Sequence, residues 1–172
     1  MSIEELMNDK GIKPKEKTEM MSSWLLEGKL PIAQLIEFAG KGKDPVRATC
    51  IEAMEFATKQ KPALADEPML AFVTQSLGAK APRIKWEAAK VIGNIAHLFP
   101  AKLDEAISGL LVNTEHEGTV VRWSAAYALG EIVKLKIIRN KDLIPAVEAI
   151  CQREEKNSIR KIYAAALKVA AK

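Results

Sequence analysis

Four segments of the chain are versions of one another and recur at an almost constant spacing. They begin DPVRATCIEA, PRIKWEAAKV, TVVRWSAAYA and NSIRKIYAAA, and each has a β-branched residue followed by a basic one. The basic residues are separated by 38, 37 and 38 positions: Arg47, Lys85, Arg122 and Arg160. A period in this range is typical of proteins that stack similar helical units. The repeat therefore constrains the fold more than any other feature.

Apolar residues within each copy recur at spacings of three and four, as they do on one face of an α-helix. In the second copy these residues are Ile84, Ala88, Val91, Ile92 and Ile95. Another amphipathic segment precedes each copy, and it begins at a helix-start signal such as Pro31, Asp66 or Asn140. Short polar connections fit tight turns between the two helices. Each unit is therefore predicted to be an antiparallel helix pair.

Residues 1–28 depart from the repeat. Ser2 is positioned to cap a short helix that Gly11 ends, and Pro14 opens a second helix. An irregular first pair is expected because a terminal unit must cover the open end of a stack. We therefore predict a single domain over 1–172, with capping helices in 1–28 and four helix-pair repeats in 29–172. The predicted fold is all-α, a right-handed α-solenoid.

Two strings resemble the second helix of HEAT repeats, which belong to the armadillo-type superfamily. They are VRWSAAYALG from Val121 to Gly130 and IKWEAAKVIG from Ile84 to Gly93. The resemblance extends from about Leu30 onward, and the period agrees with the HEAT unit of roughly 40 residues. It implies that the second helices line a concave surface and that the four basic residues form a ladder between units. It also implies a binding scaffold more often than an enzyme.

Charge and composition narrow the classes of function. No apolar run is long enough for a membrane span, and the polar N-terminus does not resemble a secretory signal, so we expect a cytoplasmic protein that does not bind membranes. Cys50 and Cys151 lie at apolar helix positions, and we expect both to be reduced core residues. Of the net charge of +4, the segment from Lys134 to Lys172 carries ten Lys/Arg against four Asp/Glu.

The candidate binding residues lie on the second helices, opposite the predicted core face. Successive residues turn by about 100° around a helix, which gives one outward stripe in each unit. The stripes supply these residues: Trp86, Lys90, Trp123, Tyr127, Lys134 and Lys161. Two tryptophans at equivalent positions predict an aromatic ridge beside cations, which suits an acidic, partly apolar protein segment. Alternatively, curvature closes the groove and the two indoles pack on each other or on neighbouring helices.

No catalytic motif, metal-ligand spacing or cofactor-binding loop occurs in the sequence. Glu87, Glu131 and His97 could approach the same groove, but such residues occur on any solvated helix. We therefore predict a non-enzymatic scaffold, without cofactor or metal, that binds another protein or peptide. The alternative is a nucleic-acid-binding protein related to the HEAT-like alkylpurine DNA glycosylases, which the basic C-terminal segment favours. A role like that of HEAT-like phycobilin lyases rests on fold analogy alone, and the oligomeric state stays open.

Overall fold

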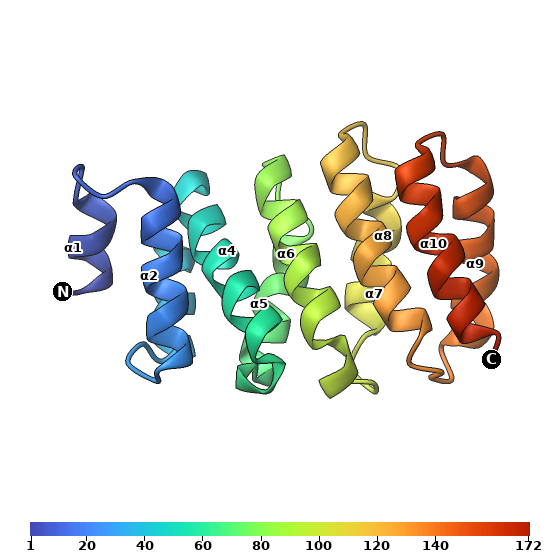
Figure 1. Ribbon diagram of the computed structural model, residues 1–172, viewed down its shortest axis with the longest axis horizontal. Coiled ribbons are helices and arrows are strands. Elements are labelled where there is room, and N and C mark those ends of the chain that lie inside the picture. Colours follow the sequence, from blue (N-terminus) through green and yellow to red (C-terminus); the bar gives the residue numbers. More distant parts are fainter.

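The computed structural model describes all residues from 1 to 172 and contains no β-strand. The structure contains ten α-helices and two short 3-10 helices, η1 (Pro62–Leu64) and η2 (Ala96–Leu98). The α-helices are α1 (Ile3–Asn8), α2 (Pro14–Leu26), α3 (Ile32–Lys41), α4 (Asp44–Gln60), α5 (Glu67–Ser76), α6 (Pro82–Ile95), α7 (Asp104–Asn113), α8 (Thr119–Val133), α9 (Asn140–Arg153) and α10 (Asn157–Ala170). They stack side by side, with the two termini at opposite ends (Figure 1). The predicted all-α solenoid is confirmed.

The helices alternate between two layers. Helices α2, α4, α6, α8 and α10 form the front layer in Figure 1, and α3, α5, α7 and α9 lie behind it. We call the solvent side of the front layer the second-helix face. None of the helices combines the length and the apolar character that a membrane-spanning segment requires.

Local capping and prolines in the first turn explain where several of the helices begin. The Asp66 carboxylate accepts a hydrogen bond from the Met69 backbone N–H at 2.9 Å, which satisfies a free amide at the start of α5. Ser2 and Glu5 form a reciprocal capping box on α1. Pro14 opens α2 as predicted. Pro100 does not open α7, because the chain continues as a loop after η2 and the helix begins only at Asp104.

The core runs between the two layers along the whole stack. The predicted core residues of α6 are all buried, and those of α8 are buried as well. In α10 the inner residues Ile159, Tyr163 and Ala166 are buried, whereas Leu167 and Ala170 are half-buried. Helix α10 lies at one end of the stack (Figure 1).

The two cysteines differ in burial. Cys50 is buried, and burial raises the pKa of its thiol to about 12. Cys151 is half-buried and packs against the core from its edge, so it is a core residue only in part. It lies in α9, the last outer-layer helix, where its Sγ faces the Arg160 carbonyl of α10 at 3.6 Å.

In α4 and α6 the basic residue near the start of the helix bonds the carbonyl groups that end the preceding helix. Arg47 donates to the Ala39 and Gly40 carbonyl oxygens at 3.3 and 3.1 Å. Lys85 donates to the Leu77 carbonyl oxygen at 3.1 Å. The C-terminus of a helix carries partial negative charge and unpaired carbonyls, so a cation there is favourable.

Two of the ladder cations also reach the next unit. Lys85 Nζ donates to Asn113 Oδ1 at 3.3 Å, and the Arg122 Nε donates to Glu154 Oε2 at 3.1 Å. Arg122 additionally donates to the carbonyl oxygens of His116 and Glu117 at 3.1 and 3.0 Å. The Arg160 side chain makes no such bond and is exposed.

Candidate protein-binding face

The six predicted binding residues fall into two groups on the second-helix face. Trp123 has 39% of its surface exposed, and Lys161 is exposed as well. The other four residues are half-buried: Trp86, Lys90, Tyr127 and Lys134. Only Trp123 and Lys161 are therefore exposed among the six.

Trp123 stacks on Tyr127, one turn further along α8. Their ring centroids are 6.1 Å apart and the ring planes differ by 12°. Such a stack holds both rings against rotation, so Trp123 presents a fixed aromatic surface to solvent. Trp123 therefore stacks on Tyr127 and not on Trp86.

Tyr127 is fixed from its other side by α6. Its hydroxyl donates to Asn94 Oδ1 at 2.6 Å, and its ring lies directly over Gly93. A Cβ atom at position 93 would stand only 2.3 Å from Tyr127 Cε2, so the close approach of the ring requires glycine. Burial, followed by the charges of Glu131 and Glu55, raises the pKa of Tyr127 to about 12.

The Asn94 amide is itself hydrogen-bonded to α4. Its Nδ2 donates to the Glu55 carbonyl oxygen at 3.2 Å and to Thr58 Oγ1 at 3.1 Å. Thr58 in turn donates to the Met54 carbonyl oxygen at 2.7 Å. A continuous chain of hydrogen bonds therefore links the aromatic pair of α8 to two preceding second helices.

Trp86 occupies the position equivalent to Trp123 but has different surroundings. Its indole Nε1 donates to Glu87 Oε1 at 2.9 Å, which is the neighbouring residue in the sequence. The same carboxylate lies 3.8 Å from Lys90 Nζ. Lys134 is paired as well, with Glu131 Oε1 at 2.9 Å. These three predicted binding residues are thus already engaged within the chain.

Three carboxylates on α4 and α6 were not among the predicted binding residues. Glu55 and Glu87 have only 6% and 2% of their surfaces exposed, and Glu52 is half-buried. Glu87 Oε2 has no hydrogen-bond partner. Burial raises the pKa of Glu87; Lys90 lowers it, and Glu52 and Glu55 raise it further. A sequence signal existed, because Glu55 stands where the next two units have Gly93 and Gly130.

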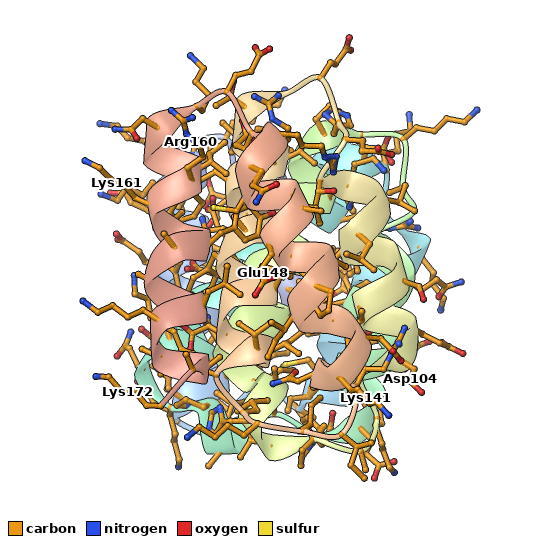
Figure 2. All side chains as sticks on the ribbon, turned by 90° about the vertical axis from the view of Figure 1, so that its right-hand side faces the viewer. Asp104, Lys141, Glu148, Arg160, Lys161 and Lys172 are labelled. Carbon is orange, nitrogen blue, oxygen red and sulfur yellow. The ribbon has the colours of Figure 1, made fainter.

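Helix α10, the final helix of the front layer, carries lysines instead of carboxylates. Lys161, Lys168 and Lys172 on α10 form no ion pair within the chain. Figure 2 shows Lys161 and Lys172 projecting toward the second-helix face, away from α9. The face therefore runs from carboxylates on α4 and α6, through the aromatic pair on α8, to lysines on α10.

No three His, Cys, Asp or Glu side chains are grouped as a metal-binding set. Of the residues that could approach the groove, His97 is exposed and Glu131 is paired with Lys134.

No protein-family model matches this chain, and no curated protein matches it in sequence. Solved structures do match. A designed armadillo repeat protein in complex with the peptide (KR)4 has 18% identity and a TM-score of 0.75, over 98% of this chain and 80% of that one. An engineered protein has 17% identity and a TM-score of 0.77, over 99% and 80% of the two chains.

A natural protein is also similar. The complex of CpcE and CpcF of phycocyanin lyase from Nostoc sp. PCC7120 matches with 17% identity and a TM-score of 0.72, over 95% of this chain and 96% of that chain. At this level of identity the three likenesses show a shared fold. The chain has the architecture of armadillo and HEAT-like repeat proteins.

Proposed function

We propose that this chain is a non-enzymatic scaffold that binds another protein through its second-helix face, around Trp123, Tyr127 and Lys161. The observation that carries the proposal is the exposed, stacked Trp123. Tryptophan is prominent among the residues that dominate binding energy at interfaces, and a side chain that is already fixed loses little entropy on binding. The hydrogen bond of Tyr127 to Asn94 supplies that fixation.

The charges near the aromatic pair define the partner. Lys161 and Lys168 on the adjacent helix have no carboxylate partner of their own. An acidic, partly apolar segment would place an apolar side chain on Trp123 and its carboxylates on these lysines. The designed armadillo protein binds a basic peptide, (KR)4, and supports peptide binding on this architecture; the sign of the charge follows from this chain's own lysines.

Nucleic acid suits the face less well. Its affinity depends on neutralising several phosphates along a backbone. The lysines of α10 occupy one end, whereas Glu52, Glu55 and Glu87 occupy α4 and α6, where they repel a phosphate chain crossing the face. A mobility-shift assay at low salt distinguishes the two functions: the protein-binding proposal expects no shifted DNA or RNA.

Selection from a random peptide display library tests the proposal. We expect the selected peptides to be rich in Asp and Glu with at least one large apolar residue. Their binding should weaken about tenfold or more in Trp123→Ala, since loss of an interface tryptophan commonly costs more than 1.4 kcal/mol. Lys161→Glu should weaken it as well.

The matched control lies on the opposite layer. Val112 on α7 is an apolar residue with 70% of its surface exposed, so Val112→Ala removes a comparable exposed side chain from the outer layer. Its affinity for the selected peptides should equal that of the unmodified protein. Peptides that bind Trp123→Ala as tightly as the unmodified protein would remove the assignment of this face.

A further inference from the structure

A groove opens between α3 and α5, beside the first cation of the ladder. Its volume is about 500 Å³. Ile36, Phe72 and Ala79 form its apolar walls, and Arg47 is the only charged residue in its lining. All four side chains are half-buried. The groove lies between the first two repeats, and the proposed function, which concerns α8 and α10, makes no use of it.

The next two ladder cations each bond a side chain of the following unit. Lys85 Nζ reaches Asn113, the residue that ends α7, whose Oδ1 accepts at 3.3 Å. Arg122 reaches Glu154, the residue after α9: its Nε donates to Oε2 at 3.1 Å and its Nη2 donates to Oε1 at 3.4 Å. A side-chain acceptor from the following unit therefore accompanies both cations.

Arg47 lacks such an acceptor. The residue that ends α5 is Ser76, which is buried like Asn113 but shorter, and its Oγ donates to the Phe72 carbonyl oxygen at 2.8 Å. Arg47 uses Nε and Nη2 for two carbonyl oxygens near the end of α3, and its Nη1 makes no hydrogen bond within the chain. Arg47 and Ser76 both line the groove, so it lies where a longer side chain at the end of α5 would meet the cation.

The unused donor determines the chemistry that fits the groove. A guanidinium group presents its N–H donors in a planar fork that matches the two oxygens of a carboxylate, and Arg122 binds Glu154 in this way. No acidic residue lines the groove, so none competes for Arg47 there. The apolar walls favour a carboxylate that is attached to an apolar group. The volume lies within the range of about 300–1,000 Å³ that is usual for small-molecule sites.

We propose that this groove binds the carboxylate of a ligand that has an apolar body. The carboxylate accepts hydrogen bonds from Arg47 Nη1 and from the exposed amide of Gln75, and the apolar body lies against Ile36 and Phe72. The bound carboxylate thus joins the first repeat to the second, as Glu154 joins the fourth to the third. A small organic acid and the C-terminus of a peptide with an apolar last residue share this chemistry.

Phenylpropionate and phenylpropanamide are matched probes, because they have the same apolar body and differ in the carboxylate. Titration of the isotope-labelled protein is followed through the backbone N–H resonances of Gly40 and Gly78, which line the groove. We expect phenylpropionate to bind with a dissociation constant on the order of 1 mM and the amide to cause no saturable shift up to about 20 mM. The peptide acetyl-Gly-Phe, with a free or an amidated C-terminus, forms the second pair. Tighter binding of the free peptide than of phenylpropionate supports a peptide terminus as the ligand, and weaker binding supports a small acid.

Two variants act on the cation and on the missing acceptor. Arg47→Gln should weaken phenylpropionate binding at least tenfold, because it removes the charged donor. Ser76→Asn places at the end of α5 the residue that ends α7, so the chain should bond Arg47 itself and bind phenylpropionate more weakly, with an unchanged or higher midpoint of thermal unfolding. This second variant keeps the test decisive if Arg47→Gln does not fold.

Arg160→Gln is the matched control, because Arg160 is the exposed ladder cation whose side chain makes no bond, and it should bind phenylpropionate like the unmodified protein. Equal binding of phenylpropionate and phenylpropanamide overturns the proposal. So does phenylpropionate binding that persists unchanged in Ser76→Asn and in a folded Arg47→Gln, or the absence of saturable binding by both acids up to about 20 mM.

Discussion

A single glycine decides how closely α8 approaches α6. Gly93 lies under the Tyr127 ring, which is held by Trp123 on one side and by Asn94 on the other. Gly130 is at the equivalent position in α8, but there a Cβ atom would meet Ala166 Cβ at 3.2 Å, a much milder contact. The two glycines therefore have different tolerances for a side chain.

We expect Gly93→Ala to destabilise the protein by about 1–3 kcal/mol, because the added methyl group must displace the fixed ring. Gly130→Ala should be close to neutral, since the helix propensity of alanine, about 1 kcal/mol better than glycine, offsets the tight contact. Urea unfolding followed by circular dichroism compares the two variants directly. Equal free energies of unfolding would contradict the account of Tyr127 packing.

The buried carboxyl group of Glu87 makes stability depend on pH. Its pKa in the folded protein is raised above the ordinary value of 4.5, so the folded state favours the protonated form. The stability that protonation confers is present below pH 4.5 and is lost as the pH rises through the folded pKa. Glu87→Gln stays neutral and keeps an acceptor for the Trp86 indole.

We therefore expect the change in the free energy of unfolding caused by Glu87→Gln to be more favourable at pH 8 than at pH 4, by about 1 kcal/mol. Denaturant unfolding at both pH values measures this difference. Glu52→Gln is a suitable control, because Glu52 is half-buried and bonded to Thr18 and Arg83. A Glu87→Gln effect that is independent of pH would show that burial does not perturb this carboxyl group.

At the scale of the helices, Arg47, Lys85 and Arg122 bond carbonyl groups of their own unit, and Lys85 and Arg122 also bond the next unit. The side chains of Arg122 and Glu154 are 19% and 5% exposed, so each neutralises a largely buried partner. Burial by itself would raise the pKa of Glu154, but hydrogen bonds from the Lys156 N–H and Arg122 lower it overall. The equivalent residue of the last unit, Arg160, has no acidic partner of the kind that Glu154 provides for Arg122.

We expect Arg122→Leu to cost about 2–4 kcal/mol, because it leaves the Glu154 carboxylate buried without its cation. Arg160→Leu, at the equivalent position in the last unit, should change the free energy of unfolding by about 0.5 kcal/mol or less. Because the pKa of Glu154 is lowered, the contribution of the pair is present above pH 4.5 and is lost as the pH falls through the folded pKa. Chemical denaturation at pH 7 tests both variants; a similar loss in each would argue against the bridge between units.

The sequence predicts the helices well and the surroundings of the candidate binding residues less well, for a physical reason. Helix periodicity and caps such as Asp66 are local, so they can be seen within a few residues. The surroundings of Tyr127 depend on Asn94, which is 33 positions away and on another helix. Equivalent positions in the repeat suggested equivalent tryptophans. Glu87, which follows Trp86, accepts its indole N–H, whereas the residue that follows Trp123 is Ser124. This local difference in sequence would have distinguished the two tryptophans.

Over the whole molecule, the second-helix face changes character from one end to the other. Carboxylates on α4 and α6 precede the aromatic pair on α8, and the lysines of α10 follow it. The proposed function therefore predicts a preferred direction for a bound segment, with its acidic residues over α10. The other tryptophan at the N-terminal end, Trp24 on α2, is distant from this arrangement along the stack.

Indole N–H resonances of the three tryptophans provide the most direct test of the binding face. In a titration with an acidic peptide selected on the protein, the resonance of Trp123 should shift or broaden, because its ring meets the peptide. The resonance of Trp24 should stay in place, and the hydrogen-bonded indole of Trp86 should change less than that of Trp123. A binding peptide that perturbs Trp24 and leaves Trp123 unchanged would contradict the proposal that α8 and α10 form the protein-binding surface.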